Sequence, residues 1–302
     1  MTATTVAAVI PAYNAAHLLA RCLESVLRQT VPVQEVWVVN DGSTDDTAAV
    51  LQRWQEKDSR IHAIHQRNGG AATARNAGIV AASSEWVAFL DADDTWMPEK
   101  LERMLAIRER GPQAVVLYHD AVLPDGTRFL ADKGPAEGDV FDALLRSFFI
   151  LPSTAMVRRE VLVAEGMFQT NFRNTDDYDL WLRLGRKGRF LLRNEPLTYY
   201  ERQPTSLSHN TLRTGENEIA IFTGLLASDL TPRQRRLASR RLARRYFERA
   251  YHLRSTDPAE SWRCLRRSLQ LRPGSAVTWK LLLANLWRRH RQHATPQQNA
   301  QG

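Results

Sequence analysis

The chain contains little cysteine and no long apolar run. Its two cysteines, Cys22 and Cys264, lie far apart in 302 residues and match no metal or redox spacing, which favours a reducing, cytoplasmic setting. No apolar run approaches the ~20 residues that a membrane-spanning helix needs. The first residues also lack the basic segment of a secretory signal. We therefore expect neither a spanning helix nor a leader.

Acidic residues are scarce only in the C-terminal part. Residues 231–302 hold 17 Lys and Arg against 3 Asp and Glu, whereas residues 1–230 hold 24 against 30. The net charge of +8 therefore comes from the tail region, and the larger part is mildly acidic. Because 302 residues exceed one average domain, we predict three parts. They are a main domain over residues 1–215, a basic helical region over 216–291 and a disordered tail over 292–302.

Apolar runs of strand length alternate with helical patterns in the main domain. The first four runs are residues 6–10, 36–39, 61–64 and 86–90. Helical spacing of apolar residues fills the intervals between them. This alternation predicts an α/β fold with a mostly parallel sheet, whose ligands bind beyond the carboxyl ends of the strands. Further on, the patterns predict strands at 114–118, 154–157 and 193–200, a helix at 140–149, a turn at 125–126 and a helix opening at 174–179.

Polar sequences follow three of the predicted strands. They are Pro11-Ala12-Tyr13-Asn14, Asn40-Asp41-Gly42-Ser43 and Asp91-Ala92-Asp93-Asp94. We expect Pro11 to end its strand and Asn14 to cap the next helix. Because parallel strands present their carboxyl ends at one edge, the three segments should place an aromatic ring, a carboxylate and a carboxylate cluster along that edge. Turn and cap chemistry is the competing explanation for each segment taken alone.

The carboxylates at 91–94 lie close enough in sequence to repel one another. Such a cluster either holds a proton or binds an oxygen-seeking divalent cation such as Mg²⁺ or Mn²⁺. The alternative is an acidic turn before a helix that starts near Pro98. The residues of this segment alone favour neither interpretation.

Five ordered motifs resemble those of the family 2 glycosyltransferases, which have the GT-A fold. The resemblance covers roughly residues 5–210. The motifs are Val9-Ile10-Pro11-Ala12-Tyr13-Asn14, Val39-Asn40-Asp41-Gly42-Ser43-Thr44-Asp45, Ala74-Arg75-Asn76-Ala77-Gly78, Phe89-Leu90-Asp91-Ala92-Asp93-Asp94 and Thr175-Asp176-Asp177-Tyr178-Asp179-Leu180-Trp181-Leu182-Arg183. The resemblance implies a Rossmann-like sheet flanked by helices and a nucleotide-sugar donor bound at the strand ends.

The resemblance also implies roles for individual residues. Pro11, Ala12, Tyr13 and Asn14 would border the nucleobase, Asp41 would contact the base or ribose, and Arg75 would lie near the diphosphate or help hold Asp41. Asp91-Ala92-Asp93 resembles the DXD motif, with Asp93 as the foremost ligand of Mn²⁺ or Mg²⁺ and with Asp91 or Asp94 in support. Asp177 matches the catalytic base.

The chain departs from the family pattern at two positions. Asp176 stands where the family usually has Glu, which shortens the side chain beside the base. Gln203 stands where the family often has His, which affects a supporting contact to the metal or diphosphate. His209 lies nearby, and an ordinary loop histidine is the simpler interpretation of it.

The predicted chemistry is a single displacement with inversion. An acceptor hydroxyl must lose its proton as it attacks the anomeric carbon, so one carboxylate, Asp177, acts as general base. The leaving nucleoside diphosphate gains charge, which a metal on Asp93 would stabilise. No protein nucleophile is needed, unlike in a retaining glycosidase. The expected role is bacterial-type cell-surface glycan or glycoconjugate assembly, with a glycan, a lipid-linked molecule or another hydroxyl compound as acceptor.

Rival functions remain at this stage. A sugar nucleotidyltransferase would open with a Gly-rich phosphate loop, which this chain lacks. A non-catalytic nucleotide-sugar-binding module that docks on a partner through its C-terminal helices would lose its base or metal motif, yet Asp93 and Asp177 are both present. A nucleic-acid-binding protein would leave the acidic strand ends unexplained, so we expect no nucleic-acid partner.

The tail region has a helical pattern rich in arginine. The first predicted helix carries seven arginines: Arg233, Arg235, Arg236, Arg240, Arg241, Arg244 and Arg245. A solvated helix face is the commonest explanation, and contact with an anionic membrane surface is the functional one that we favour. Residues 257–290 loosely resemble one tetratricopeptide-type helical pair. The expected localisation is cytoplasmic, with peripheral contact at the inner face of the cell membrane.

Overall fold

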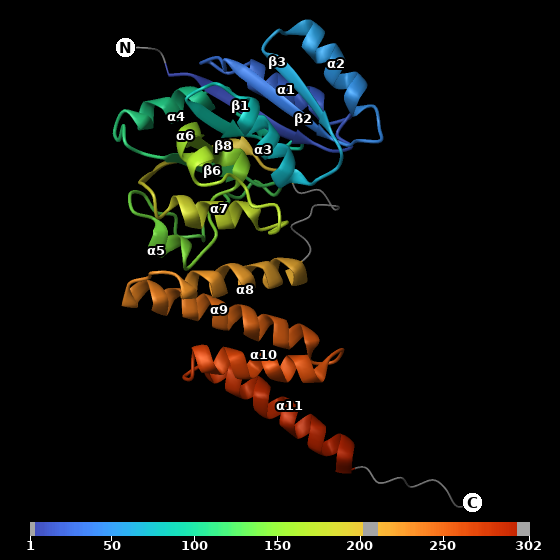
Figure 1. Ribbon diagram of the computed structural model, residues 1–302, viewed down its shortest axis with the longest axis vertical. Coiled ribbons are helices and arrows are strands. Elements are labelled where there is room, and N and C mark those ends of the chain that lie inside the picture. Colours follow the sequence, from blue (N-terminus) through green and yellow to red (C-terminus); the bar gives the residue numbers. More distant parts are fainter. Residues whose placement is uncertain (1–3, 202–210, 295–302) are drawn as a thin grey trace, which may run out of the picture. The chain divides into compact units, whose positions relative to one another are not determined.

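The structure is a computed structural model that describes residues 4–201 and 211–294 (Figure 1). The chain divides into two compact units, residues 1–209 and 210–302. The first unit holds an eight-stranded sheet of order β3-β2-β1-β4-β7-β6-β8-β5. Its strands are β1 (Val6–Ala12), β2 (Glu35–Asp41), β3 (Ile61–Gln66), β4 (Trp86–Phe89), β5 (Thr95–Trp96), β6 (Val116–Val122), β7 (Ala155–Arg158) and β8 (Phe190–Tyr199).

The first half of the sheet is parallel. Strand β1 pairs in parallel with β2 and β4, and β2 with β3, whereas β7 pairs antiparallel with both β4 and β6. The carboxyl ends of β2, β1 and β4 therefore lie side by side. The predicted α/β class with a mostly parallel sheet is confirmed, and so is the common edge for the three polar segments.

Strand β1 continues through Pro11, contrary to our expectation. It reaches Ala12, and Pro11 is in register with Val39 of β2. On its other side, β1 pairs with β4 only as far as Val9 opposite Phe89. Proline has no N–H group to donate. Because β1 does not pair with β4 beyond Val9, Pro11 costs no hydrogen bond to β4.

Helices cover both faces of this sheet. They are α1 (Leu19–Leu27), α2 (Thr47–Lys57), α3 (Ala71–Ala81), α4 (Lys100–Arg108), α5 (Phe141–Leu144), α6 (Arg159–Ala164) and α7 (Asp176–Leu184), with the 3-10 turn η1 (Pro152–Thr154). The even-numbered β1 residues Ala8 and Ile10 share a core with buried Leu23 of α1. The odd-numbered Val9 meets Gly78 of α3. Because strand side chains alternate between faces, α1 and α3 lie on opposite faces.

One predicted helix is much shorter than expected. Only Phe141–Leu144 is helical within residues 140–149. Leu145, Phe149 and Ile150 are buried, yet they lie in a turn and in irregular backbone. Their burial produces the apolar spacing that predicted the helix. The turn at 125–126 is confirmed, with Gly126 in the left-handed region at φ 80°.

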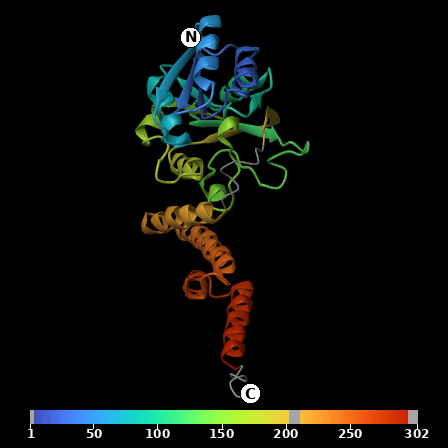
Figure 2. The ribbon, with the colours of Figure 1, turned by 90° about the vertical axis from the view of Figure 1, so that its right-hand side faces the viewer.

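The second unit is a succession of helices, each packed on the next (Figures 1 and 2). They are α8 (Thr211–Ala227), α9 (Pro232–Leu253), α10 (Pro258–Leu271) and α11 (Ala276–Ala294). Helix α8 was not among the predicted helices. Helix α11 includes residues 292–294 of the tail that we predicted to be disordered, and residues 295–302 lie outside the described residues. In the described parts of both units, no helix has the length and apolarity to span a membrane.

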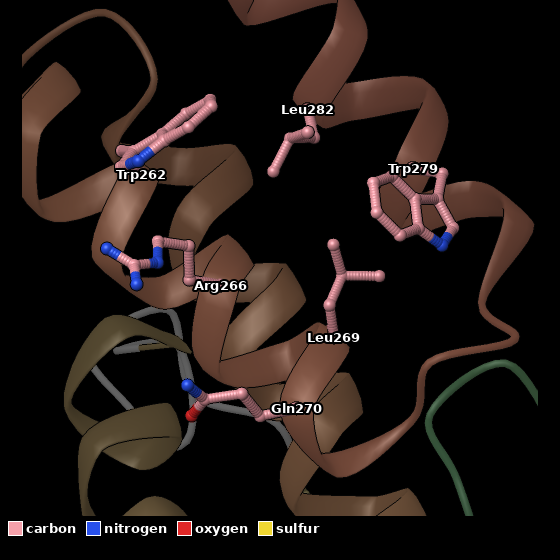
Figure 3. Close-up of a pocket in the computed structure, with 6 residues that line it drawn as sticks. All are labelled: Trp262, Arg266, Leu269, Gln270, Trp279 and Leu282. Carbon is pink, nitrogen blue, oxygen red and sulfur yellow. The ribbon is translucent and has the colours of Figure 1, made fainter.

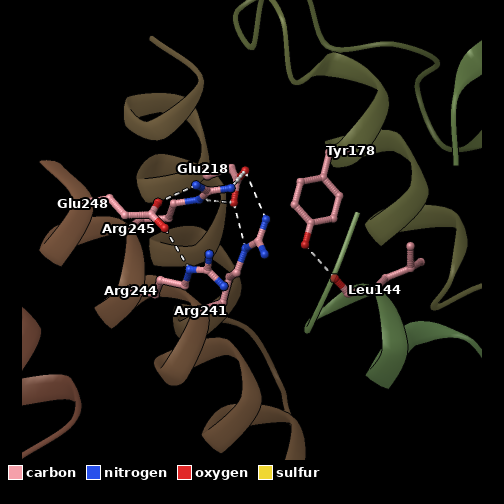
Figure 4. A network of polar contacts seen from close by, with 7 residues as sticks. All are labelled: Leu144, Tyr178, Glu218, Arg241, Arg244, Arg245 and Glu248. Carbon is pink, nitrogen blue, oxygen red and sulfur yellow. Dashed lines mark hydrogen bonds and ion pairs between the residues drawn. The ribbon is translucent and has the colours of Figure 1, made fainter. Parts of the chain in front are cut away.

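A buried carboxylate organises the start of this unit. Glu218 of α8 is 3% exposed and accepts from Arg241 Nε at 2.9 Å and from Arg245 Nε at 2.7 Å (Figure 4). Two of the eight arginines on α9 therefore bind Glu218 and hold α8 and α9 together. Arg244 pairs with Glu248 one turn further along α9.

Candidate functional site

The loops after β1 and β2 are bonded to each other. Asn14, at φ 48°, donates its backbone N–H to Ser43 Oγ at 2.9 Å and accepts the N–H of Thr44 at 2.8 Å. Its predicted role as a helix cap is wrong, because α1 begins at Leu19. Asn14 instead joins the two strand ends, and Tyr13 beside it is 53% exposed. The Tyr13 ring is therefore exposed on a loop that hydrogen bonds hold to the loop after β2.

Asp41, at the end of β2, shapes the loop that precedes α3. Its carboxylate is buried and accepts from Gln66 Nε2 at 2.7 Å and from the N–H groups of Gly69 at 2.8 Å and Gly70 at 2.7 Å. The suggestion that Arg75 helps to hold Asp41 is wrong, since the ion pairs of Arg75 are made elsewhere. Asp41 positions the 66–70 loop.

Helix α3 positions Arg75 between the residues that follow β4 and the start of α7. Gly78 allows this packing, because a Cβ there would lie 2.5 Å from Val9 Cγ1 of β1. The neighbouring Asn76 donates to the carbonyl of Phe168 at 2.8 Å and accepts its N–H at 3.0 Å. The motif at 74–78 therefore places one helix face against the sheet and fastens it to the chain before α7.

Arg75 joins two distant acidic segments. Its guanidinium lies 2.6 Å from Asp91 after β4 and 3.2 Å from Asp176 at the start of α7. Arg75 and Asp176 are both buried, so the surrounding protein screens this link little. The ion pairs of Arg75 bring Asp177, the neighbour of Asp176, close to residues 91–94 after β4. We call residues 91–94 the acidic loop.

The acidic loop is anchored from behind by Ser153 of η1. The Asp91 N–H donates to Ser153 Oγ at 3.0 Å, and the Ser153 carbonyl accepts from Trp96 Nε1 at 3.0 Å. Asp94 is fully buried and accepts the Glu201 N–H at 2.9 Å. Asp94 is thus occupied in fixing the loop to the end of β8.

Arg21 of α1 holds the front of the same loop. It donates to the Asp93 carbonyl at 2.8 Å and lies 3.3 Å from Glu201 Oε1. The backbone on both sides of the Asp93 side chain is therefore fixed. The carboxylate of Asp93 is itself half-buried and makes no ion pair with another described residue.

Crowding of carboxylates raises several pKa values here. Burial, and then the charge of Asp91, raise the pKa of Asp93 to about 6. Burial, and then the charges of Asp91 and Asp93, raise the pKa of Asp94 well above its usual range. Burial and the same carboxylates also raise the pKa of the Tyr200 phenol, with Asp177 contributing. The charges of both the acidic loop and Asp177 therefore act on Tyr200.

Asp177 has the properties of a proton acceptor in a shielded place. Burial, and then the charge of Asp176, raise its pKa to about 8, against the opposing effect of Arg75. Its carboxylate accepts the N–H of Tyr178 at 2.7 Å. As a residue, Asp177 is partly exposed.

The residues present fit a divalent cation at Asp93. The fit rests on burial and on the charges of neighbouring carboxylates, which together raise the pKa values of Asp93 and Asp94 and which a cation would offset. In the described part of the chain, no three His, Cys, Asp or Glu side chains converge as a complete metal site. A cation such as Mg²⁺ takes one or two carboxylates and completes its shell with phosphate oxygens and water.

Sequence patterns missed four residues of this site. Arg21, Ser153, Tyr200 and Glu201 contact or adjoin the acidic loop from α1, η1 and the end of β8. Of these, Tyr200 is the last residue of the strand predicted at 193–200. Gln203 and His209 lie outside the described residues.

Comparisons with known proteins identify the family to which the chain is similar. Residues 7–164 match the model of Glycosyl transferase family 2. A Bacillus subtilis (strain 168) protein, named as teichuronic acid biosynthesis glycosyltransferase TuaG, is 35% identical over 221 residues, 72% of this chain and 86% of that protein. The chondroitin synthase of Pasteurella multocida (strain Pm70) is 32% identical over 183 residues, 60% of this chain but 19% of that protein.

Solved structures match over nearly the whole chain. S. aureus TarS 1–349 in complex with UDP-GlcNAc has a TM-score of 0.70 at 19% identity, covering 89% of this chain and 81% of that chain. Mannosyltransferase PcManGT from Pyrobaculum calidifontis, in complex with GDP-Man and Mn²⁺, has a TM-score of 0.61 at 19% identity, covering 96% and 87%. At these identities the likeness concerns the fold, and it confirms the predicted GT-A architecture.

Proposed function

The chain belongs to glycosyl transferase family 2, and we propose that it moves a sugar from a nucleoside-diphosphate donor to an acceptor hydroxyl with inversion. The observation that carries this proposal is the Arg75 link, at 2.6 Å to Asp91 and 3.2 Å to Asp176. This link holds Asp91 of the acidic loop close to the start of α7, which carries Asp177. Leaving-group stabilisation and proton removal need such separate carboxylates within reach of one substrate.

Each group then has one task. Tyr13 and Asn14 border the base from the loop after β1, and Asp41 supports the loop that passes the nucleotide. Asp177 accepts the proton of the attacking hydroxyl. Arg75 fixes the two acidic segments and offers positive charge beside the diphosphate.

Mn²⁺ or Mg²⁺ would be held by Asp93, with Asp91 sharing its carboxylate with Arg75. When bound, the cation supplies charge stabilisation for the leaving diphosphate. Asp94 and Ser153 keep the Asp93 backbone in place. Asp176 stays paired with Arg75 and orients the turn that carries Asp177.

Cell-surface glycan or glycoconjugate assembly is the expected setting. The names of the relatives, which concern teichuronic acid and chondroitin synthesis, support a polysaccharide or its lipid-linked precursor as acceptor. We propose that the protein works in the cytoplasm as a peripheral protein at the inner face of an anionic membrane, with no nucleic-acid partner. A non-catalytic nucleotide-sugar-binding module is the alternative, and the presence of both Asp93 and Asp177 disfavours it.

A panel of nucleotide sugars tests the proposal by thermal shift and by transfer. We expect one donor to raise the melting temperature only with Mn²⁺ or Mg²⁺ present. Asp93→Asn should lose that metal-dependent shift. Asp177→Asn should keep the shift and lose transfer by about 10²- to 10⁴-fold, the usual contribution of a general base. Asp132→Asn, an exposed carboxylate, is the matched control.

Two outcomes would contradict the proposal. Near wild-type transfer by Asp177→Asn would remove the assigned base. The absence of any shift with every nucleoside diphosphate, with and without metal, would remove the donor site.

A further inference from the structure

The start of α11 concentrates exposed apolar side chains. Val277, Trp279 and Leu283 are 60%, 47% and 60% exposed. Trp279 and Leu283 are four residues apart, so they share one face of the helix. Exposed apolar groups scattered singly need no explanation, but Trp279 and Leu283 together form a local surface that water solvates poorly.

A hollow of about 480 Å³ lies beside this surface (Figure 3). Trp262, Arg266, Leu269 and Gln270 of α10 and Trp279 and Leu282 of α11 line it. Four of these six side chains are aromatic or aliphatic. Trp262, Arg266 and Gln270 follow at intervals of four residues along one side of α10, and Trp279 lies across the hollow from them (Figure 3). The hollow is therefore apolar, with a guanidinium and an amide on one side.

The charge around the hollow has one sign. Residues 261–285 contain five Lys and Arg and no Asp or Glu. Arg266, Arg272 and Lys280 among them are exposed. The preceding acidic residue, Glu260, is engaged with Arg249 at 3.7 Å and Arg263 at 2.7 Å. An occupant of this surface must therefore offer both apolar groups and negative charge.

Helix α9, which is richest in arginine, is less available. Arg241 and Arg245 are committed to the buried Glu218, and Arg235 donates to the carbonyl of Leu226 at 2.6 Å. Much of the charge that suggested a membrane contact at α9 thus serves to hold the helices together. The charge on residues 261–285 has no such internal acidic partner in that stretch.

We infer that the α10–α11 face, comprising Trp262, Arg266, Arg272, Trp279, Lys280 and Leu283, docks on an anionic bilayer surface. The indole rings and Leu283 enter the headgroup region, where tryptophan is favoured. Arg266, Arg272 and Lys280 meet lipid phosphates, each contributing attraction near the surface. The inference rests on the proposed function in one respect: it names the surface that brings the enzyme to a membrane.

Vesicle flotation of the full chain tests the inference. The probes are vesicles of phosphatidylcholine alone and vesicles of phosphatidylcholine mixed with phosphatidylglycerol. We expect binding to the anionic vesicles that weakens with added salt. Trp279→Ala and Arg266→Glu should each lower the partition constant. For Arg266→Glu, which removes one basic residue, we expect a decrease of about fivefold or more.

Two matched controls separate this face from α9. Tyr251 is 47% exposed, the same fraction as Trp279, so Tyr251→Ala removes an equally exposed ring elsewhere in the unit. Arg236→Glu reverses an exposed charge on α9. Both variants should keep wild-type partition within about twofold, less than the change expected for one basic residue at the membrane.

Three results would overturn the inference: equal or negligible binding to both kinds of vesicle, an effect of Arg236→Glu as large as that of Arg266→Glu, or a dimer that Trp279→Ala dissociates without any change in partition. The last would assign the face to a second copy of the chain. Nucleoside-diphosphate thermal shift on the same samples distinguishes the two proposals. Loss of the thermal shift alone would overturn the proposed function. Loss of flotation alone would overturn the assignment of the α10–α11 face to membrane binding.

Discussion

At the scale of single residues, the central fact is that the proposed base is held in its protonated form. Burial and the charge of Asp176 raise the pKa of Asp177 from 3.8 to about 8. A general base must be unprotonated to accept the hydroxyl proton. The free enzyme at neutral pH therefore carries mostly the inactive form of this group, and approaching positive charge would favour the active one.

The pH profile follows from this pKa. We expect kcat/KM to rise about tenfold per pH unit below pH 8 and to level off above it, because this parameter reports the free enzyme. Initial rates at saturating metal, from pH 6 to 9, check the profile. A profile that stays flat across that range would remove Asp177 from the rate-determining proton transfer.

Asp177→Asn should also make the free protein more stable at high pH. The folded-state pKa lies above the unfolded value, so the native protein holds a proton that the unfolded chain releases between about pH 4 and 8. Stability of the wild type therefore falls as pH rises through this window. The asparagine variant escapes that loss. The difference in melting temperature, variant minus wild type, should be near zero at pH 4.5 and positive at pH 8.5.

Asp132→Asn is the control for that measurement, because its carboxylate is exposed. It should show no pH-dependent difference. A lower melting temperature for Asp177→Asn at pH 8.5 would contradict the destabilisation that we assign to the ionised form of Asp177 in the folded protein.

At the scale of elements, the position of Arg75 depends on how closely α3 approaches β1. Gly78→Ala would place a Cβ 2.5 Å from Val9 Cγ1 in the middle of the sheet. We expect a loss of about 1–3 kcal/mol in the free energy of unfolding, the usual cost of overpacking. Transfer should fall as well, because α3 carries Arg75. Urea unfolding and initial rates measure the two effects.

Gly224→Ala in α8 is the matched control. A Cβ at Gly224 meets no atom within 4 Å, so the change should stabilise the helix by about 0.5–1 kcal/mol. If both substitutions stabilised the protein, the close packing of α3 on β1 would be wrong.

The elements also show which features a sequence can reveal. Strands β1, β2 and β4 and their polar ends follow from local alternation and from the chemistry at Asn40–Asp41 and Asp91–Asp94, so the shared edge was predictable. Ser153 and Arg21 were not, because each contacts the acidic loop from more than 60 residues away in sequence. One of the two partners of Arg75, Asp176, was missed for the same reason, since it is 101 residues distant.

At the scale of the whole molecule, catalysis and helical packing use separate sets of charges. All carboxylates of the described site come from residues 41–201, whereas the Arg–Glu network of α8 and α9 centres on Glu218 (Figure 4). Composition showed that residues 231–302 are basic. It did not show that two of the arginines face an acidic residue on α8, since α8 itself was not predicted.

Glu218→Gln should therefore destabilise the helical unit and leave the donor site intact. Removing one partner from a buried pair costs about 3–5 kcal/mol, and here Arg241 and Arg245 both lose their contact with Glu218, while Arg245 keeps Glu248. Amide hydrogen exchange should accelerate in α8 and α9, while the metal-dependent shift with nucleoside diphosphate persists. Glu216→Gln is the control, because that carboxylate is 56% exposed and an exposed pair contributes at most about 1 kcal/mol. Equal exchange in the two variants would show that Glu218 does not hold α8 to α9.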